Sequence, residues 1–442
     1  MPDPFRHYEG VPVLDLPAEP PAPDKPGAEG PAFLSQLLYY SAAISATKLV
    51  PSTGFRYALR VNPSSGNLHP TEFHFVTRGL KDWPDGLYHY RPSSHMAEQR
   101  AIGDFRIAGS DAPIVFILTS IAWREEWKYR DRAYRYCLHD IGHAWQSLAL
   151  AAEAMGCESS GIRDFPDDKI AQSLRLHGDE WPMLILEIRG SSIPLREPEA
   201  SDTVWYGGTA NQLSKVTIAY PRIEAIHAAT KVIVNSAVEP APAGAGQIEL
   251  PPPAQSIVSF GEIARQRRSA LDFVGGTRSM TLPQLSAVLE AARPLLSVIQ
   301  LYLYVHRVDG LAPGVYRFWP ESSPNQSALE LIKTGDERVA AAGLSLGQDL
   351  AGNACVAFSM IGDLERATRA HGDRGYRYVY FEAGAVGHRF YLAAESLGLG
   401  ATGIGAFYDE EVHRYLHVTP DQGQVVYHFA IGYPVPDPRL QA

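Results

Sequence analysis

The amino-acid sequence predicts an α+β protein made of two similar modules in tandem. Two proline-rich segments divide the chain, the parts on either side of the second segment repeat one another, and strand-like runs alternate with helix-like runs. With 442 residues, of which 45% are hydrophobic, the chain is long enough for about two to four domains with sizeable cores.

The proline-rich segments set the expected module boundaries. They cover residues 17–32 (PAEPPAPDKPGAEGPA) and residues 237–255 (AVEPAPAGAGQIELPPPAQ). Segments of this composition bury too little apolar surface to fold alone. We therefore predict an N-terminal extension at 1–32, a first module at 33–235, a linker at 236–256 and a second module at 257–442.

The two modules are related by a fixed spacing. DRAYRYCLHDIG begins at Asp131 and DRGYRYVYFEAG begins at Asp373, and the same offset of 242 residues aligns AAEAMG with AAESLG and GIRDFPDD with GIGAFYDE. Three matches in one register indicate a duplication. Upstream, LSQLL matches LPQLS and GLYHYRP matches GVYRFWP, but the offset falls by about twenty residues between these pairs. The second module therefore lacks a counterpart of the stretch LRVNPSSGNLHPTEF at Leu59–Phe73.

The spacing of hydrophobic residues along the chain predicts the helices and strands of each module. HDIGHAWQSLALAAEAMG and EAGAVGHRFYLAAESLG have apolar residues at helical spacing and end at glycine, so each predicts a long buried helix. Short β-rich runs predict strands: TEFHFVTR, APIVFILTS and MLILEIRG in the first module, and IQLYLYVHR, ACVAFSMIG and VVYHFAIG in the second. We expect a mixed sheet covered by helices in each module, and two such modules can pack as a pseudo-symmetric dimer within one chain, with a site at the seam.

Composition excludes several classes of function. The net charge of -10 argues against a nucleic-acid-binding surface, which needs clustered Lys and Arg. Neither a signal peptide nor a run of about 18 apolar residues occurs, so we expect a cytoplasmic protein without a membrane segment. Cys137, Cys157 and Cys355 are too few and too scattered for a disulfide framework or a zinc site, so no metal is predicted. A small molecule or another protein is the expected partner.

Several motifs follow one another along the two halves: PSSGNLHPTE, GLYHYRP, KYRDRAYRY and DIGH in the first, and RRSALDF, DRGYRYVYFEAG and LGLGATGIGAF in the second. Together they resemble the FMN-dependent nitroreductase superfamily, and most closely its SagB-type branch of thiazole/oxazole oxidase-like dehydrogenases. The resemblance covers most of the chain outside the proline-rich segments. It implies two nitroreductase-like modules, each a mostly antiparallel sheet flanked by helices, packed as an intrachain pseudo-dimer, and an FMN site assembled from both.

The resemblance assigns the flavin ring to a loop of the first module. Pro63, Ser64, Ser65 and Asn67 match the family's loop that hydrogen-bonds the ring, whose edge offers donors and acceptors to serine hydroxyls and an asparagine amide. Taken alone, the same peptide would be typical of an Asx or Ser turn before a strand.

The resemblance assigns the FMN phosphate and ribityl chain to the second module. Arg267, Arg268 and Ser269 match an arginine-rich element, and arginine offers forked, permanently charged donors to a phosphate. Leu271 stands where the family has a basic residue, so neutralisation is expected to be incomplete or shared with a residue such as Arg439. The alternative is a solvated basic helix start.

The resemblance also assigns a backbone segment of the second module to flavin N5. Gly405 and Ala406, between Ile404 and Phe407, match the family's segment whose N–H groups point at N5, whereas the first module has Arg163 and Asp164 there. GLGATG follows a helix and precedes a strand, the reverse of a dinucleotide-binding turn. The first module thus keeps the ring loop and lacks the arginine element, while the second shows the opposite loss. We predict one composite flavin site at the module interface.

Lys128 and Tyr129 match a Lys-Tyr pair that is catalytic in the azoline-oxidising branch, and the second module has Ala370 and His371 instead. Free lysine and tyrosine titrate near 10, so either needs a lowered pKa to act as a base at neutral pH. The alternative is a surface lysine beside a packed tyrosine.

Other polar residues recur in both modules and favour a role in the fold. Arg132, Arg135 and Tyr136 recur as Arg374, Arg377 and Tyr378, and the acids Asp140 and Glu382 could pair with these arginines. His143 matches a family position but has Ala385 as its counterpart.

The resemblance therefore predicts an FMN-dependent dehydrogenase or oxidase that acts on an azoline or similar C–N bond in a modified peptide or small natural product. Partner enzymes of a biosynthetic pathway are a further expectation. Two alternatives stay open: an NAD(P)H-dependent nitro or quinone reductase, and a flavin-free scaffold protein in a peptide-maturation complex.

Overall fold

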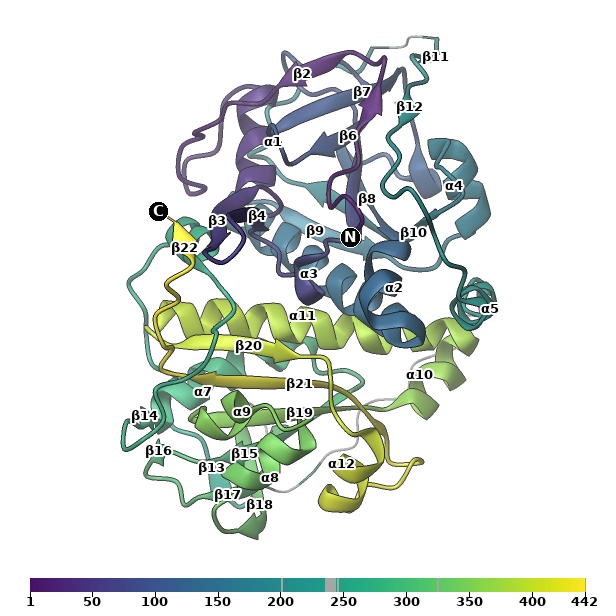
Figure 1. Ribbon diagram of the computed structural model, residues 1–442. Coiled ribbons are helices and arrows are strands. Elements are labelled where there is room, and N and C mark those ends of the chain that lie inside the picture. The colour runs from purple at the N-terminus through teal and green to yellow at the C-terminus, as the bar shows by residue number, and fades with distance from the viewer. Residues whose placement is uncertain (200–201, 235–243, 245, 324–325, 442) are drawn as a thin grey trace. The chain divides into compact units, whose positions relative to one another are not determined.

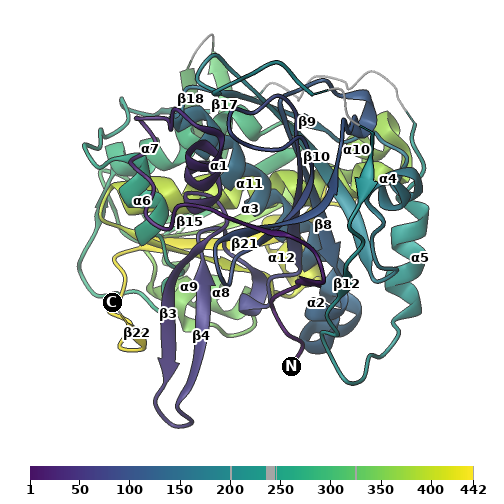
Figure 2. The same ribbon diagram turned by 90° about the horizontal axis from the view of Figure 1, so that it is seen from above.

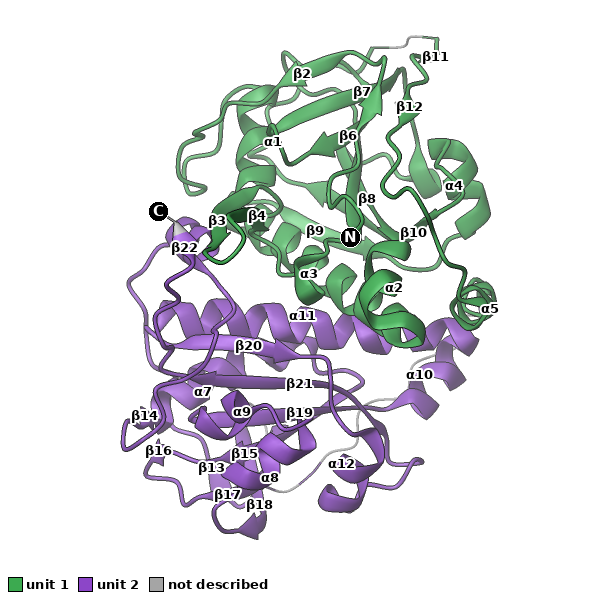
Figure 3. Cartoon of the chain, viewed as in Figure 1, with its two compact units in different colours: residues 1–233, 441–442 green, residues 234–440 purple. Residues whose placement is uncertain are grey.

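The computed structural model describes residues 1–199, 202–234, 244, 246–323 and 326–441 (Figure 1). The chain divides into two compact units, residues 1–233 with 441–442, and residues 234–440 (Figure 3). This division falls close to the predicted end of the first module at residue 235. Most of the predicted linker's first half, residues 236–243 and 245, lies outside the described residues, as does residue 235 at the predicted end of the first module. Among the described helices, none combines the length and apolar content needed to cross a bilayer.

Unit 1 is organised around an antiparallel sheet with the strand order β11-β7-β6-β5-β8-β10-β9, and β2 also pairs with β7. The strands are β2 (Val13–Asp15), β5 (Thr71–Thr77), β6 (Gly86–Arg91), β7 (Met96–Ile102), β8 (Ile114–Ile121), β9 (Glu158–Ile162), β10 (Glu180–Arg189) and β11 (Val204–Trp205). The predicted strands TEFHFVTR, APIVFILTS and MLILEIRG correspond to β5, β8 and β10, so these predictions are confirmed.

The helices of unit 1 cover this sheet. They are α1 (Gly30–Tyr39), α2 (Trp123–Tyr129), α3 (Ala133–Ala154), α4 (Asp167–Leu174) and α5 (Pro221–Ala229), with short 3-10 turns η1 (Ser65–Asn67), η2 (Ile107–Gly109) and η3 (Arg130–Arg132). The predicted long helix is α3, which packs on β5, β8, β9 and β10. Its residues Leu138, Ile141, Ala144 and Leu148 are fully buried at helical spacing, which explains why the period was readable.

The predicted N-terminal extension is packed into unit 1. β1 (Tyr8–Glu9) pairs with β12 (Thr209–Ala210), and the guanidinium of Arg6, which is buried, donates to the Asn211 carbonyl at 2.8 Å. The proline-rich part, poor in N–H donors, is held through its carbonyls: the Gln36 amide donates to Pro21, Ala22 and Lys25 at 3.2, 3.1 and 2.9 Å. Composition alone does not show such docking onto an existing sheet.

Unit 2 repeats the arrangement with the strand order β13-β18-β17-β15-β19-β21-β20, again antiparallel. The strands are β13 (Ile248–Glu249), β15 (Ile299–Val305), β17 (Gly314–Ser323), β18 (Gln326–Thr334), β19 (Val356–Gly362), β20 (Gly400–Ile404) and β21 (Gln424–Gly432). The short strands β14 (Met280–Thr281) and β16 (Val308–Asp309) form a separate parallel pair. The three strands predicted here are β15, β19 and β21.

The helices of unit 2 are α6 (Phe260–Gln266), α7 (Leu282–Ala292), α8 (Arg338–Leu344), α9 (Asp349–Asn353), α10 (Leu364–His371), α11 (Gly375–Ser396) and α12 (Asp409–Leu416), with 3-10 turns η4 (Arg293–Leu295) and η5 (Gly372–Arg374). The offset of 242 residues that relates the two halves also carries α3 onto α11, β9 onto β20 and α4 onto α12 end for end. The duplication read from the sequence is therefore a duplication of structure.

The units differ in the segment that enters the central strand. In unit 1 the hairpin β3 (Ile44–Val50) and β4 (Phe55–Arg60), followed by the loop 61–70, lies between α1 and β5. Figure 2 shows this hairpin extending away from the rest of its unit. In unit 2, α7 is followed by η4 and then directly by β15. The piece that unit 2 lacks is thus the hairpin with the loop, whereas Phe73 lies in β5, which does have a counterpart.

Candidate functional site

The predicted ring-binding loop of unit 1 is a tight turn between β4 and β5. Gly66 and Asn67 have φ of 58° and 59°, the left-handed region that glycine and asparagine tolerate best. The Asn67 amide donates to the Ala58 carbonyl at 2.9 Å, and its Oδ1 lies 3.1 Å from His69 Nε2. The Asn67 side chain therefore closes the loop on itself, while Pro63 is buried at its start.

Asp140 on α3 anchors this loop. Ser64 Oγ donates to Oδ2 at 2.6 Å, and the backbone N–H and Oγ of Ser65 donate to Oδ1 at 3.0 and 2.9 Å. Burial raises the pKa of Asp140 to about 7, although these hydrogen bonds act in the opposite direction. Because both serine hydroxyls donate to Asp140, they would face a ligand as acceptors rather than donors.

Glu382 on α11 anchors the segment that enters the central strand of unit 2. Its carboxylate accepts the Ser297 hydroxyl and the backbone N–H groups of Ser297, Val298 and Ile299, at 2.8, 2.7 and 3.1 Å for the three N–H groups. The expected pairing of Asp140 and Glu382 with the recurring arginines is wrong, because each acid instead binds the chain that enters the central strand. Both acids occupy the same position of the long helix, 242 residues apart.

The Lys-Tyr pair lies against the same loop. A Cβ placed on Gly66 would stand 2.6 Å from Tyr129 Oη and 2.9 Å from Lys128 Nζ, so the two side-chain tips meet the turn where it carries no side chain. Lys128 Nζ lies 5.0 Å from the centre of the Tyr129 ring, which packs on Tyr136 at 4.3 Å. Two of the predicted groups, more than 60 residues apart in sequence, are thus brought together within unit 1.

Lys128 and Tyr129 differ in their electrostatic surroundings. Burial, and then the charge of Glu125, raise the pKa of Tyr129 rather than lowering it. Tyr129 therefore keeps its proton at neutral pH and can act as a hydrogen-bond donor. Lys128 is exposed at the end of α2 and is the remaining candidate base of the pair.

In unit 2 the arginine element is joined to β20. The Ala270 N–H donates to the Ala401 carbonyl at 2.8 Å, and Ser269 Oγ lies 2.8 Å from the hydroxyl of Tyr391 on α11. The same hydroxyl accepts the Gly403 N–H at 2.9 Å. Because β20 runs straight into Gly405 and Ala406, the arginine element and the predicted N5 segment belong to one local structure. Sequence reasoning did not single out Tyr391, which connects them.

Positive charge accumulates in this element. Arg267 is buried and lies 5.0 Å from the centre of the Tyr391 ring. Burial, followed by the charges of Arg267 and Arg265, lowers the pKa of Arg268 to about 10, and Glu395 opposes this effect. A phosphate would relieve the repulsion among these guanidinium groups, so the donor set fits the phosphate end of FMN. Arg439, by contrast, makes a forked ion pair with Asp437 at 2.8 Å.

Gly405 and Ala406 are half-buried, and the Gln348 amide donates to the Ala406 carbonyl at 3.3 Å. The next residue, Phe407, stacks on His428 at 4.6 Å and is buried. The segment is therefore held from both sides while its small residues leave the backbone accessible. The counterparts in unit 1, Arg163 and Asp164, carry charged side chains that would cover the backbone.

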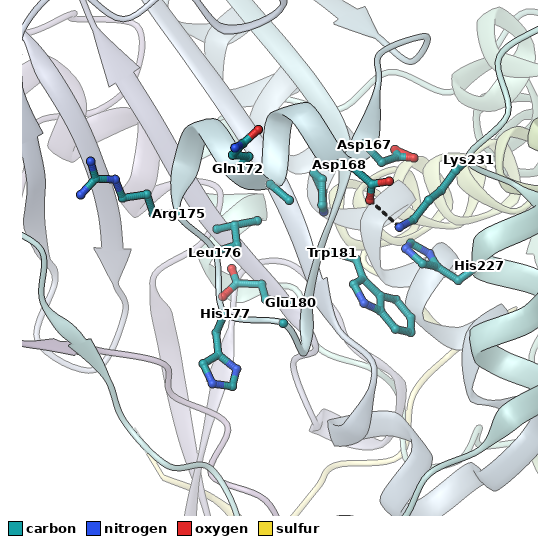
Figure 4. A pocket seen from close by; sticks show the side chains of 13 residues that line it. Asp167, Asp168, Gln172, Arg175, Leu176, His177, Glu180, Trp181, His227 and Lys231 are labelled. Carbon is teal, nitrogen blue, oxygen red and sulfur yellow. Dashed lines mark hydrogen bonds and ion pairs between the residues drawn. The ribbon is translucent and has the colours of Figure 1, made fainter.

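A separate cavity of about 430 Å³ lies in unit 1 at the end of α4 (Figure 4). Trp181 stacks on His227 in its wall, with ring centres 3.9 Å apart, and Lys231 forms an ion pair with Asp168 at 2.6 Å. Figure 4 shows these four side chains gathered on one side of the cavity. None of the predicted site residues lines it.

The two units share one α+β arrangement, and comparison with known proteins identifies the family to which it belongs. Residues 54–190 and 264–433 match the model of the Nitroreductase family, one segment in each unit, so the chain belongs to the Nitroreductase family. It is a nitroreductase-like oxidoreductase with the family domain in tandem.

A Methanocaldococcus jannaschii protein named as a nitroreductase is 33% identical over 36% of this chain and 85% of that protein. The trifolitoxin-processing protein TfxB of Rhizobium leguminosarum bv. trifolii is 28% identical over 33% of this chain and 42% of that protein. The microcin B17-processing protein McbC of Escherichia coli is 25% identical over 30% of this chain and 54% of that protein. The matches to these two processing proteins thus span about half of each.

A solved structure of a nitroreductase-type protein from Anabaena variabilis superposes on 98% of this chain and 94% of its own, with a TM-score of 0.79 and 25% sequence identity. The α+β fold with two nitroreductase-like segments is therefore confirmed. So is the predicted resemblance to tandem, SagB-type proteins of the family.

Proposed function

We propose that this protein is an FMN-dependent dehydrogenase or oxidase that acts on an azoline or similar C–N bond of a modified peptide or small natural product. The observation that carries the proposal is the contact of Lys128 and Tyr129 with the Gly66 turn. It brings the branch's catalytic pair to the loop expected to hold the flavin ring. Similarity to trifolitoxin- and microcin-processing proteins supports the choice of substrate class.

The residues of the two half-sites fit FMN. Pro63, Ser64, Ser65 and Asn67 would hold the ring edge; Arg267, Arg268 and Ser269 would hold the phosphate and ribityl chain; Gly405 and Ala406 would offer backbone to the ring. When bound, FMN supplies a hydride acceptor. The proposal needs the two units to pack as an intrachain pseudo-dimer, so that one composite site forms.

The chain's own residues would then prepare the substrate. Asp140 fixes the Ser64–Ser65 turn against α3, so that the loop presents acceptors in a set direction. Tyr129, which keeps its proton, would donate a hydrogen bond and orient the substrate. Lys128 Nζ would take the proton that the substrate carbon loses. Partner enzymes of a biosynthetic pathway would supply the cyclised substrate.

The test is turnover of a thiazoline-containing model peptide by the flavin-loaded protein, with the azole product followed by mass loss. Lys128→Met and Tyr129→Phe should each lower the rate by ~100-fold while leaving bound flavin unchanged. Lys81→Met, an exposed lysine of the same unit with its Nζ 3.9 Å from Asp82, should keep the wild-type rate. Equal rates in all variants would refute the assignment of the pair.

Two further measurements separate the alternative functions. Rapid bleaching of the flavin by NADPH without any peptide, together with nitro or quinone reduction, would favour the NAD(P)H-dependent reductase. Purified protein that binds no added FMN would favour the flavin-free scaffold.

A further inference from the structure

Arg124 is a fully buried arginine on the helix that carries the Lys-Tyr pair. It stands in the first turn of α2, four residues before Lys128, and its side chain is 0% exposed. Because α2 has only seven residues, a displacement of its first turn also moves the pair in its last turn. A buried charge needs partners, and those of Arg124 come from three separate parts of unit 1.

The guanidinium of Arg124 joins a loop, a strand and the N-terminal segment. Its Nη1 donates to the His69 carbonyl of the loop 61–70 at 2.7 Å and to Glu72 Oε1 on β5 at 2.5 Å. Its Nε donates to the Asp3 carbonyl at 2.9 Å. The carboxylate of Glu72 balances the charge of the arginine, so the two carbonyl contacts add direction rather than neutralisation.

The loop 61–70 needs contacts of this kind. His69 has a φ of 49°, and a residue other than glycine keeps such a conformation only where its surroundings impose it. The His69 N–H donates to Ser64 Oγ at 2.8 Å, and Ser64 in turn donates to Asp140. Asp140 therefore fixes one end of the turn, and Arg124 fixes the other end through the His69 carbonyl.

The Gly66 turn lies between these two fixed ends, and it is there that Lys128 Nζ and Tyr129 Oη meet the loop. Arg124 binds the loop directly and is joined to the pair through α2, so one side chain is connected to both partners of this contact. Such a connection matters because a misplacement of about 1 Å can cost roughly 100-fold in rate.

The first residues of the chain complete the arrangement. The Asp3 carbonyl accepts from Arg124, and the next carbonyl, that of Pro4, accepts from Arg60 Nη2 at 2.7 Å. Arg60 is buried at the end of β4, directly before the loop, and its guanidinium lies 5.2 Å from the centre of the Phe5 ring. Two buried guanidinium groups, at the two ends of the loop, thus hold adjacent carbonyls of the N-terminal segment.

We propose that Arg124 is a positioning residue of the candidate site, and that it forms one frame with Arg60 and residues 3–5. This frame keeps the Gly66 turn at a fixed distance from the Lys-Tyr pair. Arg124 acts through the His69 carbonyl and through α2. The inference rests on the proposed function of the pair, and it extends the site to the N-terminal segment, which the predicted boundaries placed outside the first module.

The first test needs neither flavin nor substrate. Amide hydrogen exchange, read by mass spectrometry, compares the wild type with Arg124→Met and Arg124→Lys. In Arg124→Met we expect exchange to rise by ~10-fold or more in the loop 61–70 and in α2, because the contacts that hold them are lost. The rise should be smaller in Arg124→Lys, which keeps a charge for Glu72 but lacks the fork. The buried helix α3 should keep its protection.

An unchanged loop in both variants, or faster exchange spread evenly over unit 1, overturns the inference. Arg100 provides the matched control. It is buried in the same unit and also donates to backbone carbonyls, those of Gly207 at 3.0 Å and Arg175 at 3.4 Å. Arg100→Met should lower the melting temperature as Arg124→Met does, but leave exchange in the loop 61–70 at the wild-type rate. If both methionine variants expose the loop alike, a general loss of stability explains the effect and the inference fails.

The second test uses the flavin-loaded protein. Arg124→Met should lower kcat for the azoline by ~10-fold to 100-fold with a smaller change in KM, because the Lys-Tyr pair is displaced from the turn but not removed. Arg124→Lys should restore part of kcat, and Arg100→Met should keep it. Arg124→Lys carries both comparisons if Arg124→Met does not fold.

The two tests also separate this inference from the proposed function. Equal kcat values in Arg124→Met and Arg100→Met would overturn the inference and leave the proposed function in place. If the wild type turns over no azoline, the proposed function fails, and the exchange experiment still decides whether Arg124 holds the loop.

Discussion

Gly66 is the residue at which the loop and the Lys-Tyr pair meet, and it combines two demands on one position. Its φ of 58° is unfavourable for any residue with a Cβ, and a Cβ there would stand within 3 Å of both Tyr129 Oη and Lys128 Nζ. The positive φ affects the stability of the fold, whereas the closeness of the two side-chain tips affects the geometry of the site. A suitable control can separate them.

We expect Gly66→Ala to cost about 1 kcal/mol of stability and to lower turnover by ~10-fold to 100-fold, because the two side-chain tips must move. Gly54→Ala is the matched control, since Gly54 has a φ of 68° but nothing within 4 Å of its Cβ position. It should show the same loss of stability with full activity. Thermal denaturation and steady-state turnover measure the two effects, and equal activities in the two variants would count against the site.

Glu125 offers a second contrast, between a buried acid without partners and one with partners. Replacing Glu125 with methionine removes an unpaired buried carboxyl and should stabilise the protein by ~1–3 kcal/mol. Glu72 is equally buried but paired with Arg124 and His89, so replacing it with methionine should destabilise the protein by ~3–5 kcal/mol. Denaturant unfolding at neutral pH provides the comparison. A destabilised Glu125→Met would mean that the carboxyl has a structural role.

At the scale of elements, the sheet of unit 1 carries a buried chain of charges that should make its stability depend on pH. His89 on β6 lies between Glu98 on β7 at 2.8 Å and Glu72 on β5 at 3.0 Å. Burial alone would lower the pKa of His89, but its hydrogen bonds to the two acids outweigh burial and raise the pKa to about 9. The folded state therefore binds this proton more tightly than the unfolded state does.

A raised histidine pKa contributes stability that is complete below the unfolded value near 6.5 and is lost as the pH rises through about 9. The full difference is about 3 kcal/mol, as an order of magnitude. We expect the melting temperature of wild-type protein to fall across this window, and His89→Gln to remove most of the slope. His177→Gln is the control, since that side chain is 65% exposed. A wild-type melting temperature that stays level from neutral pH to above 9 would contradict the assignment.

The elements also show where sequence reasoning succeeds and where it ends. The six predicted strands and both long helices are confirmed, because their apolar residues recur at a period that burial imposes. The β3–β4 hairpin was not predicted: most of its residues are only half-buried, so ISATKLV and FRYALR carry no strong period. The partners of Ser64 and Ser65 were also missed, since Asp140 is 75 and 76 residues away and nothing local marks it. Lys128, Tyr129 and the arginine element were found only through resemblance.

At the scale of the whole molecule, duplication followed by complementary loss has a direct consequence for cofactor binding. Unit 1 has the turn and the Lys-Tyr pair, but at the positions of Gly405 and Ala406 it has Arg163 and Asp164. Unit 2 has the arginine element joined to β20, but it lacks the hairpin and loop before β15. On the proposed assignment, the described residues of neither unit alone would supply both the ring cradle and the phosphate clamp.

We therefore expect about one FMN per chain, where an unspecialised pair of such units would bind two. Absorbance of released flavin against protein concentration measures the ratio. Arg268→Ala should weaken FMN binding by ~10-fold or more, because a charged partner of the phosphate is lost. Arg414→Ala, a surface arginine of the same unit that is 75% exposed, should leave the affinity unchanged. A ratio of two would show that each unit completes its own site, and the single composite site would then have to be abandoned.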